Sequence, residues 1–154
     1  MKLQAISLVA APLLARLHKA SFTTHADWDE EFFQKLLVLP TTRGLIASEE
    51  DEPLGFILWQ QTIDTGEIIT IATLPEARRR GVASALIAGY EAQLREDGAG
   101  ESLLDVAADN TPAIALYEKQ GYAQVHRRAH YYQLYENGVE RRIDALVLKK
   151  LLQR

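Results

Sequence analysis

Residues 70–86 of this 154-residue chain read TIATLPEARRRGVASAL. The first part is rich in β-branched residues and predicts a strand, whereas the apolar residues after Gly81 recur at helical spacing. Between the two lies a run of three arginines, residues 78–80. The first turn of a helix has unpaired N–H groups and the positive end of the helix dipole, and Gly81 and the small Ala83 leave the backbone accessible. The stretch therefore predicts an anion site that would hold a diphosphate.

Two familiar phosphate-binding patterns are absent from this stretch. It lacks the Gly-Lys-Ser/Thr of a Walker loop, and it lacks the GxGxxG fingerprint of dinucleotide-binding proteins. A solvated arginine run before an ordinary helix is the alternative interpretation.

The rest of the chain mixes strands and helices without strict alternation. Strands are expected at residues 2–7, 44–48, 54–61, 67–73, 102–107, 122–127 and 143–149. Helices are expected from Pro12 to about Phe22, from a cap at Asp27 (with Glu30 completing a capping box) to before Pro40, from Gly81 to before Gly98, and from Asn110 to before Gly121. This order predicts one α+β domain over residues 1–154, built on a single sheet.

Composition excludes several classes of protein. The chain has no cysteine, so a disulfide scaffold, a cysteine zinc site and a cysteine nucleophile are ruled out, and a cytoplasmic location is expected. A net charge of −4 argues against a nucleic-acid binder. No pair of the four histidines has helical ligand spacing on a convincing apolar face, so no metal is expected. No apolar run reaches the roughly 20 residues of a membrane span, and the alternation at residues 2–7 favours a strand over a secretory signal.

The pattern Arg78-x-x-Gly81-x-Ala83 after a strand resembles the acetyl-CoA pyrophosphate loop of the GNAT superfamily of N-acetyltransferases. The resemblance covers about residues 66–149 and implies the GNAT fold, a six- to seven-stranded, mostly antiparallel sheet with about four helices. Six further segments are similar to the RimI-type branch, which acetylates the α-amino group of a ribosomal protein: LLDV at 103–106, ADN at 108–110, AIALYE at 113–118, GY at 121–122, RRAHYY at 127–132 and IDAL at 143–146.

The same resemblance implies where acetyl-CoA would bind. The strand at 69–73 would pair with the pantetheine arm, and the amides of residues 79–84 would hold the pyrophosphate. Arg78 and Arg80 would reach the nucleotide phosphate or solvent, and Asn110 would cap a helix or reach the CoA arm. The expected cosubstrate contacts are Ile71, Ala72, Thr73, Arg78, Arg79, Arg80, Gly81, Val82, Ala83, Ser84 and Asn110.

Two residues are candidates for the acid–base chemistry of acetyl transfer. Tyr117 is a candidate general acid, since a phenol with a pKa near 10 is protonated at neutral pH; a tyrosine that only packs is the alternative. Asp105 lies where the RimI-type pattern has a glutamate acting as base. An aspartate is shorter, so as a base it would need the substrate closer or a bridging water. The alternative is a structural carboxylate that accepts hydrogen bonds from the backbone or from an arginine. Glu67 is a second candidate base, expected on one strand face with Ile69 and Ile71.

The predicted activity is direct transfer of acetyl from acetyl-CoA to a primary amine, the α-amine of a protein N-terminus. The alternatives are a GNAT acetyltransferase of a small-molecule amine (a polyamine, amino acid or aminoglycoside) and a CoA-binding module without catalysis. The long polar connection before residue 143 carries Tyr131, Tyr132 and Tyr135 and is expected at the position of a substrate lid. These tyrosines suggest a binding surface, and an ordinary sheet edge is the alternative. The acidic turn at residues 49–52 would attract a basic peptide or be merely solvated. The last strand offers an edge for a homodimer.

Overall fold

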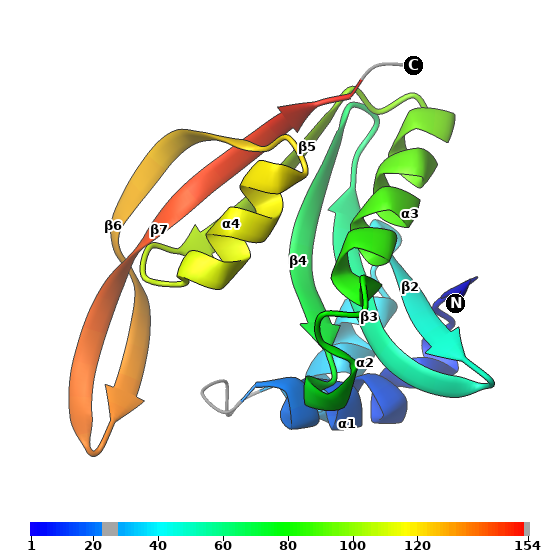
Figure 1. The fold of residues 1–154 in the computed structure, drawn as a ribbon, viewed down its shortest axis with the longest axis horizontal. Coiled ribbons are helices and arrows are strands. Elements are labelled where there is room, and N and C mark those ends of the chain that lie inside the picture. Colours follow the sequence, from blue (N-terminus) through cyan, green and yellow to red (C-terminus); the bar gives the residue numbers. More distant parts are fainter. Residues whose placement is uncertain (23–27, 153–154) are drawn as a thin grey trace.

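The computed structural model describes residues 1–22 and 28–152, which form a seven-stranded sheet with four α-helices (Figure 1). The strands are β1 (Lys2–Ala5), β2 (Thr42–Glu49), β3 (Glu52–Gln61), β4 (Thr65–Thr73), β5 (Glu101–Ala107), β6 (Ala123–Glu136) and β7 (Val139–Leu151). The helices are α1 (Ala11–Ser21), α2 (Glu30–Leu37), α3 (Val82–Glu96) and α4 (Thr111–Lys119), with 3₁₀ turns η1 (Leu8–Ala10) and η2 (Pro75–Ala77). The predicted α+β fold class is confirmed. No helix within the described ranges is long and apolar enough to cross a membrane.

The sheet has the order β1-β2-β3-β4-β5-β7-β6, and every neighbouring pair is antiparallel except β4 and β5. These two strands are parallel and pair only from Thr65 with Glu101 to Ile68 with Leu104. Beyond that point they diverge, as Figure 1 shows. The second halves of β4 and β5 are therefore not paired with each other, and the region between them is called the wedge below.

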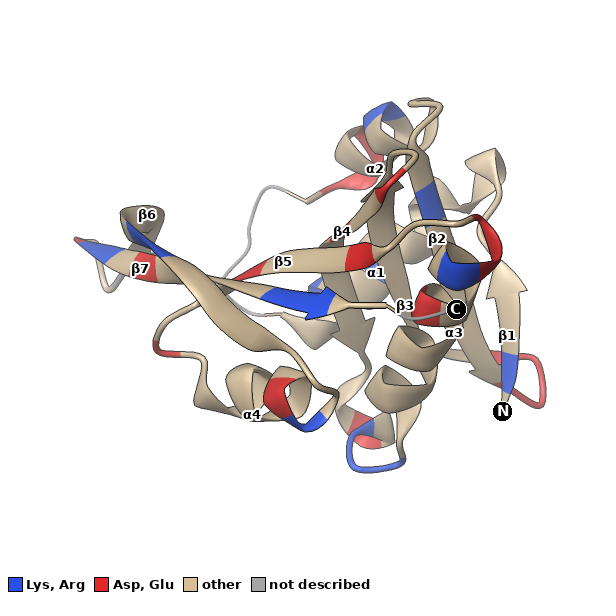
Figure 2. Cartoon of the chain, turned by 90° about the horizontal axis from the view of Figure 1, so that it is seen from above, with Lys and Arg blue, Asp and Glu red and all other residues tan. Residues whose placement is uncertain are grey.

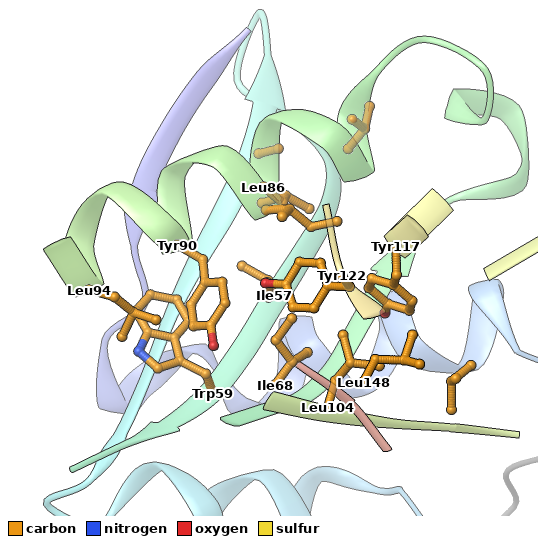
Figure 3. Close-up of a cluster of buried hydrophobic side chains, with 14 of the residues drawn as sticks. Ile57, Trp59, Ile68, Leu86, Tyr90, Leu94, Leu104, Tyr117, Tyr122 and Leu148 are labelled. Carbon is orange, nitrogen blue, oxygen red and sulfur yellow. The ribbon is translucent and has the colours of Figure 1, made fainter. Parts of the chain in front are cut away.

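The central strand β3 explains how the sheet is covered on both faces. Its run Phe56, Ile57, Leu58, Trp59 is no more than 1% exposed, as expected for a strand buried between two layers of helices. Ile57 and Trp59 pack in the cluster beneath α3, together with Tyr90 and Leu104 (Figure 3). Phe56 and Leu58 pack in a second cluster with residues of α1 and α2, among them Leu14, Leu17 and Phe33.

A buried polar network crosses the first of these clusters. The hydroxyl of Ser102 lies 2.7 Å from the hydroxyls of both Tyr90 and Tyr122. The Tyr122 hydroxyl also donates to Glu91 Oε2 at 3.0 Å, and Lys150 Nζ donates to Glu91 Oε1 at 2.7 Å. Every polar group of the network therefore has a partner, which is the condition for burying it. The network ties α3 to β5, to β7 and to the residue that precedes β6.

The helix caps confirm one prediction and replace another. Asn110 caps α4, since its side chain accepts from the Ala113 N–H at 3.3 Å. The expected cap of the second helix, Asp27, lies outside the described residues. The side chain that caps α2 is Asp29, which accepts from the Phe32 N–H at 2.9 Å. The helix thus begins at Glu30, the residue that was expected to complete the capping box.

The prediction of two short final strands with a long polar connection is wrong. β6 and β7 form one long hairpin that extends beyond the rest of the sheet (Figure 1). Its tight turn is at Asn137 and Gly138, with φ of 51° and 77°, the backbone that an Asn-Gly hairpin turn requires. Tyr131, Tyr132 and Tyr135 consequently lie on β6 and not in a lid.

β6 is irregular where it passes the end of β5. Its register against β7 shifts between Arg128 and Tyr132, and His130 has a φ of 52°. Asp144 on β7 holds this bulge, because it accepts from the His130 N–H at 2.9 Å and from Arg127 Nε at 2.7 Å. The bulge changes which side chains of β6 face the wedge.

Candidate active site

A cavity of about 900 Å³ occupies the wedge between β4 and β5. The end of α1, the loop before α3, the first turns of α4 and the strand β6 complete its walls. Most of the predicted site residues line it: Ile71, Thr73, Arg78, Arg79, Gly81, Val82, Ala83, Ser84, Asp105, Asn110 and Tyr117. Ala72, Arg80 and Glu67 are not among the lining residues.

The loop before α3 has the geometry of an anion cradle. Gly81 has a φ of 78°, a left-handed backbone that favours glycine, and α3 begins at the next residue. A Cβ added to Gly81 would meet no atom within 4 Å, so the backbone faces open space. The amides of Val82, Ala83 and Ser84 belong to the first helical turn, where N–H groups have no partner within the helix. Diphosphate oxygens fit these donors.

The three arginines of the loop have different surroundings. Arg79, with a left-handed φ of 66°, lines the cavity. Arg80 forms an ion pair with Glu49, at the end of β2. Arg78 also lines the cavity, but its Nη2 donates to the backbone carbonyl of Ser21 at 2.9 Å. Arg78 and Arg79 thus both line the cavity, while Arg78 and Arg80 each bind another part of the fold.

A bulge in the β3–β4 pairing alters the predicted faces of β4. Trp59 pairs with Ile68 and Leu58 with Thr70, so Ile69 is an extra residue. Ile71 therefore packs in the α3-side cluster and Ile69 in the α1-side cluster. The prediction that these two isoleucines share a face is wrong, because simple alternation does not survive a bulge.

Two more predicted residues of this strand are absent from the cavity lining, for separate reasons. Ala72 is fully buried in the α1-side cluster, so only its backbone is available to a pantetheine arm. Glu67 is exposed and pairs with Leu103 in the part of the sheet where β4 and β5 are still joined. It therefore does not reach the wedge.

Tyr117 extends from α4 toward the wedge. It is 9% exposed, and its ring meets that of Tyr122 edge to face at 5.9 Å (Figure 3). Burial raises the pKa of the Tyr117 phenol to about 12, because the anion would lose its solvation. The phenol is thus protonated throughout the physiological range and is able to donate a proton.

Asp105 lies on the opposite wall, on the strand face away from α3. Leu104 packs beneath α3, so strand alternation turns Asp105 to the face that α1 and α2 cover. Arg128 Nε lies 3.8 Å from Asp105 Oδ1, and the Arg128 guanidinium lies 5.4 Å from the centre of the Tyr131 ring. A carboxylate and a cation thus stand together at this end of the cavity.

Tyr132 is a second phenol at the Asp105 end. It lines the cavity, and burial followed by the charge of Asp105 raises its pKa to about 12. Sequence reasoning placed Tyr132 in a lid and gave Arg128 no role. The sequence signal that could have placed both residues is the Asn-Gly pair at 137–138. A hairpin turn there predicts that the strand before it continues through Arg128 and Tyr132.

The end of α1 supplies an aromatic wall that sequence reasoning did not assign. His18 stacks on Trp28 with ring centres 4.6 Å apart and planes 1° apart, and both line the cavity beside Ser21 and Phe22. Leu14, Leu17, His18 and Ser21 are buried on one face of α1. Their spacing of three and four residues was the signal that could have identified this helix face.

Comparisons with known proteins all point to one family. Residues 11–122 match the model of the acetyltransferase (GNAT) family. The chain is 38% identical over 100 residues to an N-alpha-acetyltransferase of Sulfurisphaera tokodaii, a match covering 56% of this chain and 60% of the relative. It is 31% identical over 94 residues to the ribosomal protein bS18-alanine N-acetyltransferase of Escherichia coli strain K12, covering 61% of each. The chain spans less than two thirds of the length of these relatives.

Solved structures show the same fold over nearly the whole chain. The ribosomal-protein-S18-alanine N-acetyltransferase of Escherichia coli superposes with a TM-score of 0.79 at 24% identity, covering 99% of this chain and 96% of that one. Arabidopsis thaliana NAA60 in complex with acetyl-CoA gives 0.79 at 22% identity, covering 97% of both. With its family-model match over residues 11–122, the chain belongs to the acetyltransferase (GNAT) family.

Proposed function

We propose that this protein transfers acetyl from acetyl-CoA to the α-amine of a protein N-terminus. The observation that carries the proposal is one cavity that joins an anion cradle to a carboxylate and a buried, protonated phenol. Relatives named as N-alpha-acetyltransferases support the acceptor class. A cytoplasmic location is part of the proposal, in keeping with a chain that lacks cysteine.

The residues present fit acetyl-CoA. The amides of residues 79–84 and the Arg79 side chain would hold the diphosphate, and Gly81 leaves it room. The open edge of β4 at Ile71, Ala72 and Thr73 would pair with the pantetheine arm as a neighbouring strand does. Asn110 is committed to capping α4 and stands beside the same cavity.

The transfer needs three things from the protein. The acceptor must lose a proton to become nucleophilic, the thioester oxygen must be stabilised as it becomes anionic, and the leaving thiolate must be protonated. When the amine nitrogen attacks the carbonyl carbon, an N–C bond forms and the C–S bond breaks. Tyr117 would give its proton to the sulfur, and a free N–H of β4 would bind the oxygen. The chain has no cysteine, so transfer through an acetyl-cysteine is excluded.

Asp105 would act as the base for the acceptor amine. An α-ammonium has a pKa of about 7.7–8.0, so a weak base suffices, whereas a lysine side chain near 10.4 requires a stronger one. The Asp105 carboxylate, acting directly or through a water, would take the proton. Because Arg128 already neighbours this carboxylate, the site favours an amine that is partly neutral at physiological pH.

A panel of acceptors tests the proposal. Purified protein is mixed with acetyl-CoA and either N-terminal peptides or free amines, and the release of CoA thiol is followed. We expect turnover on peptides with a free N-terminus and none on the same peptides with a blocked N-terminus. Turnover on polyamines, amino acids or aminoglycosides alone would establish the small-amine alternative. CoA binding without turnover on either panel would establish a binding module.

A further inference from the structure

The anion loop and the end of α1 are tied together by one side chain. Arg78 Nη2 donates to the Ser21 carbonyl at 2.9 Å, a partly buried bond between residues 57 positions apart. Ser21 closes α1, where carbonyls have no partner within the helix, and a cation there also meets the negative end of the helix dipole. The bond therefore satisfies an acceptor that the helix itself leaves open.

The bond joins two segments of the cavity wall, the loop before α3 and the end of α1. Arg78 introduces the loop that would hold the diphosphate, on the side of the sheet covered by α3. Ser21 belongs to α1, on the sheet face toward which Asp105 points. Ser21, Phe22 and Asp105 line the same cavity, so an amine bound at Asp105 would lie in the cavity that the end of α1 walls.

We infer that Arg78 is a positioning residue that holds the end of α1 in place for the acceptor and links it to the cosubstrate loop. The family resemblance assigned Arg78 to the nucleotide phosphate or solvent; its bond to Ser21 gives it a different task. The Ser21 side chain reinforces the same turn, since its hydroxyl donates to the Leu17 carbonyl at 2.7 Å. This inference rests on the proposed function for its effect on catalysis, but not for its effect on α1.

The first test does not need activity. Hydrogen exchange of the last turn of α1 is compared in wild type, R78Q, R79Q and R43Q. Arg79 has the same charge and neighbours Arg78, and Arg43 is an exposed arginine of β2 that does not line the cavity. We expect the last turn of α1 to exchange about tenfold faster in R78Q alone. Unchanged exchange in R78Q overturns the inference.

The second test separates acceptor from cosubstrate binding. With an acceptor found by the panel above, R78Q is expected to raise the acceptor KM about tenfold and to change the Kd for acetyl-CoA, measured by calorimetry, less than threefold. R79Q should raise the Kd for acetyl-CoA and change the acceptor KM little. R78K should bring the acceptor KM back toward the wild-type value, because an ammonium also donates to a carbonyl. If R78Q weakens the binding of acetyl-CoA as R79Q does and leaves the acceptor KM unchanged, Arg78 is a phosphate ligand and the inference is overturned. A wild type without turnover refutes the proposed function and leaves the exchange test standing.

Discussion

The side chain of Arg128 on β6 reaches across β7 to the carboxylate of Asp105 on β5, with Nε and Oδ1 3.8 Å apart. Arg128 pairs with Ala145 of β7 and Asp105 with Val147, so the ion pair spans two strand spacings. A cation thus stands beside the carboxylate that is proposed to receive a cationic acceptor. The charges of this hairpin are visible in Figure 2.

Replacing Arg128 with glutamine should strengthen acceptor binding at low pH. The guanidinium repels the ammonium form of the acceptor, and its removal eases that repulsion. We expect the acceptor KM to fall about threefold at pH 6.5 and little at pH 9, where the α-amine is neutral, consistent with a charge effect of under 1 kcal/mol near solvent. R142Q is the matched control, because Arg142 pairs with Glu140 farther along the hairpin. A KM that rises at every pH would mean that Arg128 holds the acceptor.

Replacing Tyr117 with phenylalanine tests the general acid. Loss of a positioned proton donor typically costs about 10²–10⁴-fold in rate, so kcat should fall in that range while acetyl-CoA affinity changes less than twofold. Y135F is the control, since Tyr135 is 69% exposed on β6 and does not line the cavity. An unchanged kcat in Y117F would leave Tyr117 a packing residue.

The pH profile follows from the raised pKa of Tyr117. The acid acts in its protonated form, and burial holds its pKa at about 12, above the ordinary value of 10.0. Activity should therefore rise as the acceptor α-amine deprotonates near pH 8 and show no loss from Tyr117 around pH 10. The raised pKa also makes the stability of the fold depend on pH. Its contribution to the free energy of unfolding is fully present below pH 10 and is lost as the pH rises toward 12. A decline of kcat/KM centred near pH 10 that disappears in Y117F would contradict this.

Asp105 is tested by three substitutions. If it acts as the base, D105E should retain or raise activity on peptide α-amines, and D105N should lower kcat/KM by about tenfold or more. The loss in D105N should shrink above pH 9, where the acceptor is already neutral. Activity in D105A equal to that of wild type would leave Asp105 a structural partner of Arg128.

Ser102 is the centre of the buried network and has no role in the proposed chemistry. Ser102→Ala removes the hydroxyl that both Tyr90 and Tyr122 contact at 2.7 Å. Leaving a buried phenol without this partner should lower the free energy of unfolding by about 1–3 kcal/mol, measured by urea denaturation. Ser48→Ala on β2, outside the network, should have a much smaller effect. A Ser102→Ala protein as stable as wild type would show that the two phenols find other partners.

The local elements around the site follow from signals in the amino-acid sequence. The β-branched run followed by Gly81 predicted the strand, the loop and the start of α3, because a left-handed turn favours glycine and helical spacing is set by neighbouring residues. The asparagine at position 110 likewise predicted the N-cap of α4. Both signals act within a few residues, so the pattern of the sequence alone predicts the strand, the left-handed turn at Gly81 and the start of α3.

The partners of the individual side chains depend on how distant segments pack together. The bulge that shifts β4 arises from its pairing with β3, and the long β6–β7 hairpin brings Tyr132 to the cavity and Arg128 to Asp105. Of three consecutive arginines, Arg79 lines the cavity, Arg80 binds Glu49, and Arg78, which also lines the cavity, binds Ser21 from 57 positions away. Such partners depend on which distant segments the two cores bring together, and no pattern within a few residues of the arginines carries that information.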